Sequence, residues 1–226
     1  MMEHPLDRPI WSALATRHAH FREGSELAMR YPSDVSPFVA GRDASPEAVA
    51  AMVALIGEGE EISMVEVAPP HAPADIAETR LPLFQMVWDK FPGAPKSAFD
   101  IQPLGEADAA DMLALATLTR PGPFRGRTHT MGRFFGVREA GRLIAMAGER
   151  LHAPGFHEIS AVCTHPDHRG RGLGAALMRK VGARILEEGD QPFLHTYASN
   201  ATAIALYRKL GFEVRAELTH AMWKRG

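Results

Sequence analysis

A glycine-rich segment in the second half of the chain has the residue types that hold an anionic ligand. Residues 158–174 read EISAVCTHPDHRGRGLG, in which an apolar stretch precedes alternating arginines and glycines. The alternating part consists of Arg169, Gly170, Arg171, Gly172, Leu173, Gly174 and Ala175. Glycine lets the backbone lie close to a ligand, and the first N–H groups of a helix have no intrahelical partner. The segment therefore predicts a strand, a turn and a helix start that together bind phosphate or pyrophosphate.

Two other interpretations of this segment compete with the first. One is a dinucleotide-binding fingerprint, because residues 170–175 fit the pattern G-x-G-x-x-A. That pattern fits poorly, since residues 165–169 separate the glycines from the strand and no acidic residue ends the next strand at residues 195–197. The other is a glycine-rich turn that only reverses the chain, and the segment alone leaves this interpretation open.

A second motif lies at residues 197–212, which read YASNATAIALYRKLGF. Together with the [QR]-x-x-G-x-[GA] pattern at residues 169–174, it resembles the pyrophosphate motif and the asparagine, leucine-tyrosine and glycine-phenylalanine signature of the GNAT superfamily of N-acetyltransferases. The resemblance covers residues 99–224, and no motif extends it to the first half. It implies an α/β fold with a mixed α+β sheet, a GNAT-like acyltransferase fold with an additional N-terminal α/β half.

The resemblance implies acetyl-CoA as the cosubstrate, an amine-bearing small molecule or peptide as the acceptor, and no metal. In this family the pantetheine arm enters a gap between two splayed parallel strands and pairs with a strand edge. The N–H groups of the glycine turn hold the pyrophosphate, and a strand N–H near Val162 stabilises the oxyanion of the tetrahedral intermediate. The expected cofactor-binding residues are Val162, Cys163, Thr164, Arg169, Gly170, Arg171, Gly172, Leu173, Gly174, Ala175 and Asn200.

The resemblance also indicates two catalytic residues. Glu158 opens the motif strand where some family members carry a catalytic glutamate, and burial beside the sheet is expected to raise its pKa toward that of a useful base. Glu149 and a water relay are the alternative bases. Tyr207 matches the family's usual proton donor to the departing thiolate. The expected reaction is direct attack of the amine on the thioester, without an acyl-enzyme.

Other polar residues near these motifs have alternative roles. Asn200 caps a helix, binds pantetheine, or does both. Cys163 is expected to be a small buried residue rather than a covalent nucleophile. A solvated loop, rather than a metal site, is expected for the histidines His157, His165 and His168. A basic loop contacts an anionic group of the acceptor, contacts the nucleotide phosphates, or is only solvated, and it contains Arg120, Arg125, Arg127 and His129.

Apolar periodicity and the positions of glycine and proline predict mixed α and β elements in both halves. In the first half we expect a helix from Asp7 toward Met29, a strand at 38–40, a helix at 46–56 and a strand at 62–67, with 81–88 unassigned. In the second half we expect strands at 99–104, 133–138, 143–150, 158–164, 193–197 and 212–223, and helices at 106–118, 174–188 and 200–210. Residues 91–96, FPGAPK, form the expected linker. It divides an N-terminal α/β region, residues 1–95, whose element order is compatible with a diverged GNAT-like half, from a GNAT-like domain, residues 96–226.

The composition excludes several classes of protein. Hydrophobic residues make up 46% and charged residues 23% of the 226 residues, which is ordinary for a globular chain and excludes a disordered one. The formal net charge of −2 gives no general attraction to nucleic acid or to an anionic membrane. One cysteine excludes an internal disulfide and a multi-cysteine zinc site. Since neither a signal peptide nor a bilayer-spanning run is visible, we expect a cytoplasmic protein.

Two functions therefore remain open. The expected one is an enzyme that transfers an acetyl group from acetyl-CoA to a primary amine. The alternative is a non-catalytic acyl-CoA-binding sensor or regulatory module, against which the presence of both Glu158 and Tyr207 argues. A monomer and an oligomer are compatible with either function, and neither nucleic acid nor a membrane is expected as a partner.

Overall fold

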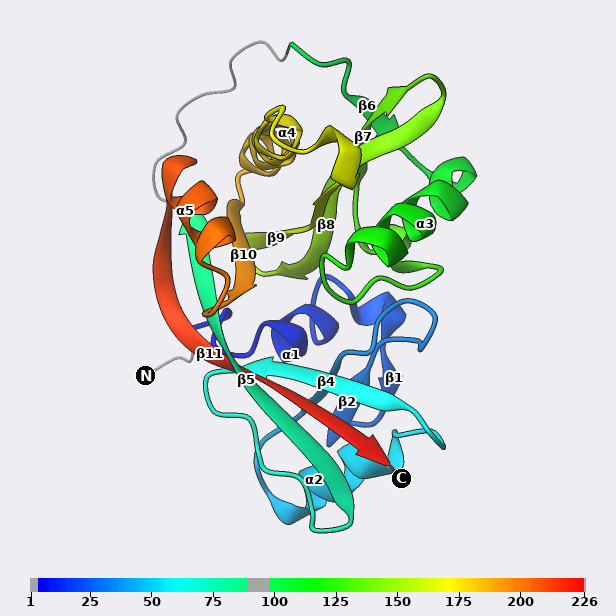
Figure 1. Cartoon of the computed structure of the whole chain (residues 1–226). Helices are drawn as coiled ribbons and strands as arrows, with labels where there is room; N and C mark the ends of the chain where they lie inside the picture. Colours follow the sequence, from blue (N-terminus) through cyan, green and yellow to red (C-terminus); the bar gives the residue numbers. More distant parts are fainter. Residues whose placement is uncertain (1–3, 89–97, 226) are drawn as a thin grey trace.

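The computed structural model describes residues 4–88 and 98–225, and these residues form two β-sheets with helices packed on them (Figure 1). The larger sheet has eight strands in the order β4-β11-β5-β10-β9-β8-β7-β6, and the smaller sheet has the order β1-β2-β3. The mixed α/β class predicted from the sequence is confirmed.

The larger sheet contains β4 (Glu61–Glu66), β5 (Ile76–Trp88), β6 (Gln102–Leu104), β7 (Phe134–Glu139), β8 (Arg142–Ala153), β9 (Phe156–Thr164), β10 (Gln191–Tyr197) and β11 (Phe212–Arg225). The smaller sheet contains β1 (Glu23–Gly24), β2 (Ala28–Arg30) and β3 (Val39–Gly41). The α-helices are α1 (Pro9–Leu14), α2 (Pro46–Ala54), α3 (Ala109–Thr119), α4 (Leu173–Glu187) and α5 (Ala201–Lys209). The 3-10 turns are η1 (Ala19–Phe21), η2 (Glu106–Asp108), η3 (Thr128–Met131) and η4 (Pro166–His168).

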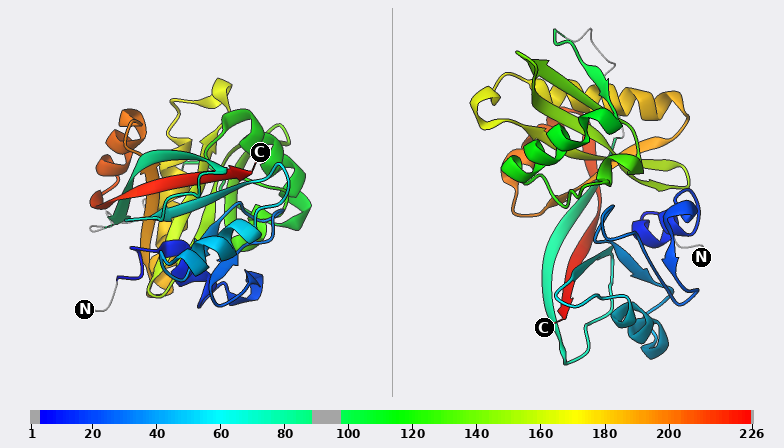
Figure 2. Two further views of the ribbon diagram at one scale, coloured as in Figure 1. Left: turned by 90° about the horizontal axis from the view of Figure 1, so that it is seen from below. Right: turned by 90° about the vertical axis from the view of Figure 1, so that its right-hand side faces the viewer.

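Strands from both halves of the sequence share the larger sheet. β5 pairs antiparallel with β10 on one side and with β11 on the other, and β4 pairs with the free side of β11. β5 and β11 run together from the part that contains α4 into the part that contains α2 (Figure 2). The expected linker at 91–96, and with it the expected boundary between residues 1–95 and 96–226, lies outside the described residues. The pairing of β5 nevertheless makes the first half a structural part of the sheet that carries both motifs.

The N-terminal helix is shorter than the sequence predicts. α1 ends at Leu14, η1 follows, and Ala28–Arg30 form β2 instead of continuing a helix. All residues of β2 are buried and pair with β3, so tertiary packing outweighs local helical periodicity here. The unassigned residues 81–88 are the end of β5, whose irregular burial gives no clean period-2 pattern.

The two faces of the larger sheet are covered by different parts of the chain. α4 packs Leu177 and Val181 into one cluster with Trp88 and Leu194. The neighbouring residue Phe193 points to the opposite face, where it joins a cluster that includes residues of α1. Among the described helices, none combines the length and the apolar character needed to cross a bilayer.

Candidate active site

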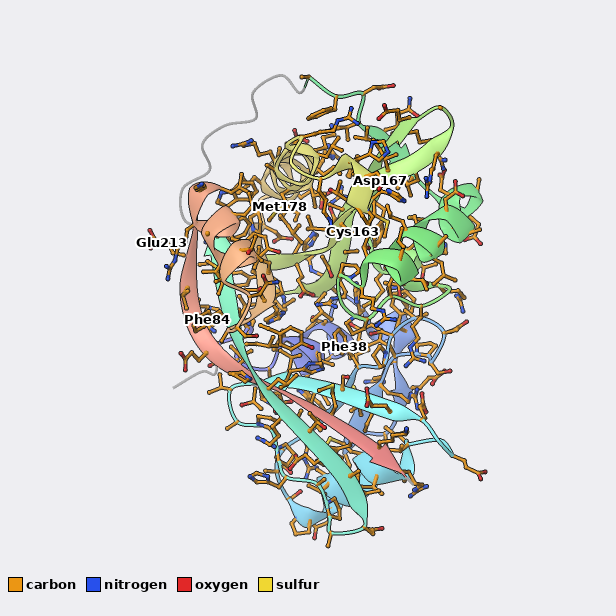
Figure 3. The ribbon with its side chains drawn as sticks, in the orientation of Figure 1. Phe38, Phe84, Cys163, Asp167, Met178 and Glu213 are labelled. Carbon is orange, nitrogen blue, oxygen red and sulfur yellow. The ribbon has the colours of Figure 1, made fainter. Side chains whose placement is uncertain are left out.

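A cavity of about 1300 Å³ is lined by β9 and β10 where these parallel strands separate. Their registered pairs end at Phe193–Glu158, so beyond Glu158 the edge of β9 that faces β10 has no partner strand. Every residue predicted to bind the cofactor or act in catalysis lines this cavity: Glu158, Val162, Cys163, Thr164, Arg169, Gly170, Arg171, Gly172, Leu173, Gly174, Ala175, Asn200 and Tyr207. Figure 3 labels Cys163 on β9 and Phe38 from the first half of the chain, and both contribute to the lining.

The arginine-glycine turn connects η4 to the start of α4. Gly170 and Gly172 have φ angles of 76° and 83°, the left-handed region that glycine adopts without a Cβ clash. A Cβ at either position would meet no atom within 4 Å, so the space beside the turn is open. α4 begins at Leu173, and the N–H groups of its first turn have no intrahelical acceptor. These features suit an anion on the cavity side of the turn.

The two arginines of the turn have different surroundings. The Arg171 guanidinium lies 2.7 Å from Glu139 and 2.8 Å from His168 Nδ1. The side chain of Arg169 makes no hydrogen bond or ion pair with any residue that the structure describes. Arg169 is therefore the more available of the two for a bound phosphate.

A bulge interrupts β9 beside the cavity. The ladder with β8 shifts between the pairs Met146–Cys163 and Gly148–Ser160, and Ala161 has a φ of 52°. A left-handed conformation is uncommon for a residue other than glycine and is held there by the surrounding sheet. Sequence patterns did not predict this bulge, because nothing about alanine signals it.

Cys163 is buried, as predicted, and packs in a cluster with residues of α3. Burial raises the pKa of its thiol to about 11. The thiolate is the nucleophilic form of cysteine, so this environment opposes a covalent role.

Glu158 is fully buried between two side chains from neighbouring strands. Arg150 Nε lies 2.8 Å from Oε2 and Arg150 Nη2 lies 2.6 Å from Oε1, while His195 Nδ1 lies 2.8 Å from Oε1. Burial by itself raises the pKa of Glu158, but the charge and hydrogen bonds of Arg150, with His195, outweigh it and lower the pKa to about 2. The expected rise in the pKa of Glu158 is therefore wrong, and the carboxylate is ionised at neutral pH.

The hydrogen bonds of Glu158 continue into the first half of the chain. Arg215 Nη1 donates to Gln85 Oε1 at 2.7 Å, which leaves the Gln85 amide nitrogen 3.0 Å from His195 Nε2. Since that nitrogen is a donor, His195 Nε2 accepts and His195 Nδ1–H donates to Glu158. Both ring nitrogens of His195 are therefore engaged, and the chain of side chains fixes the position of Glu158.

Tyr197 and His220 line another part of the cavity wall. The Tyr197 hydroxyl lies 3.1 Å from His220 Nδ1. His220 is buried, and its Nε2 has no hydrogen-bond partner among the described residues. Burial, followed by the positive charge of Arg150, lowers the pKa of His220 to about 4, so its imidazole is neutral at neutral pH.

Tyr207 and Asn200 come from α5 and the residue before it. Burial raises the pKa of Tyr207, so its hydroxyl keeps its proton at neutral pH and remains a donor. The Asn200 side chain accepts a hydrogen bond of 3.1 Å from the Ala203 N–H and thus caps α5. Because Asn200 also lines the cavity, the cap and a contact with a ligand are compatible.

Glu149, the alternative base, does not line the cavity. It is buried and bound to Arg133, with Oε1 2.8 Å from Nη2. The histidines differ from expectation as well, because His157 and His165 are buried rather than solvated. His165 Nε2 lies 2.7 Å from Arg142 Nη2, and His157 belongs to β9.

The basic loop divides into two parts. Arg120 and Arg125 line the cavity. Arg127 instead pairs with Asp34 at 3.3 Å, and His129 pairs with Glu106 at 2.8 Å. Only part of the loop is therefore placed to meet a ligand.

Sequence patterns missed several polar residues of the cavity wall, namely Arg150, His195, Tyr197 and His220, and two residues bound behind it, Gln85 and Arg215. A charged residue within a long apolar strand, as Arg150 is in β8, was a usable signal, since buried charges require partners. Gln85 and His220 gave no signal, because their contact with the site depends on strand pairing distant in sequence.

The region with these motifs is similar to known acetyltransferases. The family model described as FR47-like protein matches residues 134–223. Mycothiol acetyltransferase of Corynebacterium aurimucosum is 38% identical over 71 residues, 31% of this chain and 23% of that protein. N-alpha-acetyltransferase RimI of Mycobacterium tuberculosis is 34% identical over 83 residues, 35% of this chain and 51% of that protein. Each match therefore spans only part of the relative, about a quarter of the first and half of the second.

Two solved structures extend the comparison to the full chain. A GCN5-related N-acetyltransferase from Kribbella flavida has a TM-score of 0.66 at 19% identity, covering 96% of this chain and 95% of that one, and supports the fold alone. A protein from Novosphingobium aromaticivorans described as a "Putative Acetyltransferase from the GNAT family" has a TM-score of 0.89 at 42% identity, covering 99% of this chain and all of that one. The chain thus belongs to the GNAT family of acetyltransferases.

Proposed function

We propose that the protein transfers an acetyl group from acetyl-CoA directly to a primary amine. The observation that carries this proposal is one cavity that joins the arginine-glycine turn, the unpaired edge of β9 and the hydroxyl-bearing Tyr207. An anion site, an open strand edge and a proton donor are the three features that a thioester with a diphosphate arm requires in such a reaction.

Acetyl-CoA binding in this proposal uses mainly backbone groups. The N–H groups of residues 170–175 hold the pyrophosphate, and Arg169 adds a cation. The peptide groups of Val162, Cys163 and Thr164 pair with the amides of the pantetheine arm, as an added strand does. The side chain of Asn200 keeps the start of α5 in place beside the arm.

The chemical step needs a neutral amine and a protonated leaving group. The amine nitrogen attacks the thioester carbonyl, the C–N bond forms, and the C–S bond breaks. The Tyr207 hydroxyl donates its proton to the departing sulfur and is reprotonated from solvent. An alkyl ammonium has a pKa near that of lysine, about 10, so the acceptor loses a proton before attack.

The role of Glu158 in this proposal differs from that of a base with a raised pKa. Its carboxylate stays ionised because Arg150 and His195 hold it, and it acts as a fixed charge in the cavity wall. The proton of the ammonium then leaves through water near Glu158, Tyr197 and His220 rather than to a carboxylate that titrates near neutral pH.

The acceptor side of the cavity includes residues of the first half. Phe38, Ser63, Val65 and Leu83 line it together with residues of β10 and β11. We therefore expect the first half of the chain to contribute to the choice of amine, since these side chains, apolar except for Ser63, lie on the wall that the coenzyme motifs do not supply.

The alternative, an acyl-CoA-binding sensor, has one observation in its favour. The carboxylate expected to be the base is held by three hydrogen bonds, and the neutral His220 has a pKa of only about 4. A protein that binds the thioester without turnover fits this arrangement too. Both functions predict acetyl-CoA binding, and only the enzyme predicts an amine-dependent release of thiol.

The discriminating experiment supplies acetyl-CoA and a panel of amines and titrates the free thiol. The enzyme predicts amine-dependent release, and Tyr207→Phe lowers kcat by about 100-fold while acetyl-CoA still binds, since loss of an acid catalyst costs on that order. Tyr31→Phe, which removes a buried hydroxyl outside the cavity, is the matched control. Tight binding of acetyl-CoA without thiol release for any amine supports the sensor and refutes the enzyme.

A further inference from the structure

Three side chains at the end of the β8–β9 hairpin bring potential metal ligands together outside the acetyl-CoA cavity. They are Glu149 and His152 on β8 and His157 on β9, and none of them lines the cavity. One nitrogen of each histidine and one carboxylate oxygen of Glu149 all lie within 4.8 Å of one another. The cluster lies apart from Glu158, because His157 and Glu158 are neighbours on β9 and their side chains point to opposite faces of the strand.

A β-bulge creates this arrangement. His152 pairs with His157 across the ladder, whereas Glu149 pairs with Ile159, so β8 has one more residue than β9 between the two pairs. Residues three apart on a regular strand point to opposite faces. The extra residue of the bulge brings Glu149 and His152 to the same side. This is why spacing in the sequence did not reveal the cluster.

His157 has one buried ring nitrogen without a hydrogen-bond partner among the described residues, Nδ1, which lies 4.0 Å from Glu188 Oε2. The residue is 4% exposed, and its Nε2 lies 3.0 Å from Asp190 Oδ2. A hydrogen bond from Nε2–H to this carboxylate leaves Nδ1 without a proton, and Nδ1 has no hydrogen-bond partner among the described residues. A carboxylate that orients the far nitrogen of a histidine in this way is the usual outer partner of a metal-bound imidazole.

His152 Nε2 is also buried and without a hydrogen-bond partner in the described part of the chain. It lies 3.5 Å from Glu149 Oε2, which is longer than an N–H···O hydrogen bond of about 2.7–3.2 Å. Two buried ring nitrogens without hydrogen-bond partners thus lie beside the Glu149 carboxylate in this cluster. Buried polar atoms of this kind normally have a partner, so an ion or a water molecule suits this position.

The dimensions fit a small ion after limited adjustment. Three atoms no more than 4.8 Å apart have a common point at most about 2.8 Å from each, compared with about 2.0–2.2 Å for Zn–N and Zn–O bonds. The rings of His152 and His157 are stacked, with centroids 3.8 Å apart. A rotation of one ring about its Cβ–Cγ bond therefore accompanies coordination.

The donor set selects the class of ion. Arg133 binds Glu149 through Nη2 and Nε and also pairs with Glu188, so the carboxylate gives the cluster little net negative charge. Hard ions such as Mg²⁺ and Ca²⁺ need several charged oxygen ligands, whereas imidazole suits Zn²⁺, Ni²⁺ and Cu²⁺. We propose that Glu149, His152 and His157 form a site for a divalent transition-metal ion of this imidazole-preferring class.

Such an ion would cross-link the two strands of the β8–β9 hairpin, and its binding would not depend on the proposed acetyl transfer. The ring of His18, which follows α1, lies 4.7 Å from that of His152, so the ion also stiffens the contact between the N-terminal segment and the sheet. Its binding is measurable without acetyl-CoA, and failure of the metal site leaves the proposed function untouched.

The test uses the full chain without a histidine tag, freed of metal by chelation, and ZnCl₂ as the probe in calorimetry. We expect one ion per chain and a higher midpoint of thermal unfolding in its presence. His152→Asn and His157→Asn each weaken binding by at least about tenfold, the scale on which ligand and outer-partner changes act. His71→Asn is the matched control, because the His71 side chain is 78% exposed and outside the cluster.

Co²⁺ provides a second readout, since its visible absorption reports nitrogen coordination. Saturable uptake that disappears in both cluster variants but not in His71→Asn supports the site. Absence of saturable binding of Zn²⁺ and Co²⁺, or equal binding in the wild type and both variants, overturns it and leaves a buried water as the occupant. Circular dichroism of each variant separates loss of the site from loss of the fold, and half-buried His152 is the position that tolerates asparagine better.

Discussion

Glu158 and Arg150 show how two neighbouring strands create a fixed charge pair in the cavity wall. Each charge is buried, and each is stabilised by the other through two hydrogen bonds. Burying such charges is costly unless they are paired, and removing one partner leaves the other without compensation. Because Arg150 lies on β8 and Glu158 on β9, this part of the cavity wall keeps its charges paired only when the two strands are correctly paired.

The depressed pKa of Glu158 predicts a stability that depends on acidic pH. The carboxyl has an ordinary pKa of 4.5 when unfolded and about 2 when folded. The unfolded chain therefore binds the proton first, so the contribution of Glu158 is fully present above pH 4.5 and is lost as the pH falls toward 2. Denaturant unfolding followed between pH 6 and pH 2 measures this loss.

The variant Glu158→Gln isolates the effect. At pH 7 we expect it to lower the free energy of unfolding by about 3–5 kcal/mol, because Arg150 keeps a buried, unpaired charge. Its stability also falls less steeply between pH 4.5 and 2 than that of the wild type. The exposed Glu26→Gln is the control. Parallel pH curves for the wild type and Glu158→Gln would show that the ion pair does not set this dependence.

The turn before α4 is the element that we propose as the coenzyme site. Its two left-handed glycines and the free N–H groups of the first helical turn are local features, which is why the motif was readable from residues 169–174 alone. The open space around both glycines is what a bound diphosphate would fill. An added negative charge at this turn is therefore expected to weaken the binding of acetyl-CoA directly.

Gly172→Glu tests the turn, with Gly172→Gln as the matched variant. Both side chains strain the left-handed backbone equally, since the φ of Gly172 is 83°, but only glutamate repels a phosphate. In calorimetry we expect the dissociation constant for acetyl-CoA to be at least about tenfold higher for Gly172→Glu than for Gly172→Gln, about 1.4 kcal/mol. Equal affinities would place the diphosphate away from the turn.

The contact between α4 and β5 is a second feature at the scale of elements. A Cβ at Gly182 would overlap the ring of Trp88, which stacks on Phe212 with centroids 4.7 Å apart. Glycine usually weakens a helix, by about 1 kcal/mol relative to alanine. Its presence in the middle of α4 is explained by this close approach of helix and sheet.

Gly182→Ala is accordingly expected to destabilise the protein in spite of its better helix propensity. Forcing a methyl group into a packed core costs about 1–3 kcal/mol, measured by denaturant unfolding. Gly105→Ala is the control, because its φ of −137° is ordinary and a Cβ there meets nothing within 4 Å. An unchanged or increased stability of Gly182→Ala would contradict the packing described for Trp88.

The whole molecule is organised by β5 and β11, which connect the two halves of the chain in one sheet. β5 places Gln85 against His195 of the cavity wall, and β4 and β5 bring Ser63 and Leu83 into the lining of the cavity. The first half is therefore integral to the site. The share in choosing the amine that we propose for it would follow from sheet topology, which no motif in residues 4–88 indicates.

Sequence motifs indicated one part of the cavity lining and gave no sign of most of the rest, for a physical reason. Residues 158–175 and 200–207, the proposed coenzyme side, depend on local backbone geometry, which short motifs encode. Gln85, His195 and His220 meet through pairing of β5, β10 and β11, which depends on contacts far apart in the chain. The predicted rise in the pKa of Glu158 is wrong because no sequence motif reveals its partner Arg150. The predicted N-terminal helix is too long because the burial of β2 outweighs helical periodicity.

A structure of the protein with bound acetyl-CoA is the decisive test of the proposed coenzyme site. We expect electron density for the diphosphate over the N–H groups of residues 170–175 and for the pantetheine arm along the edge of β9 between Val162 and Thr164. The thioester would then lie within reach of the Tyr207 hydroxyl. Density for the coenzyme at another surface, with this turn empty, would contradict the proposed transfer and the site built for it.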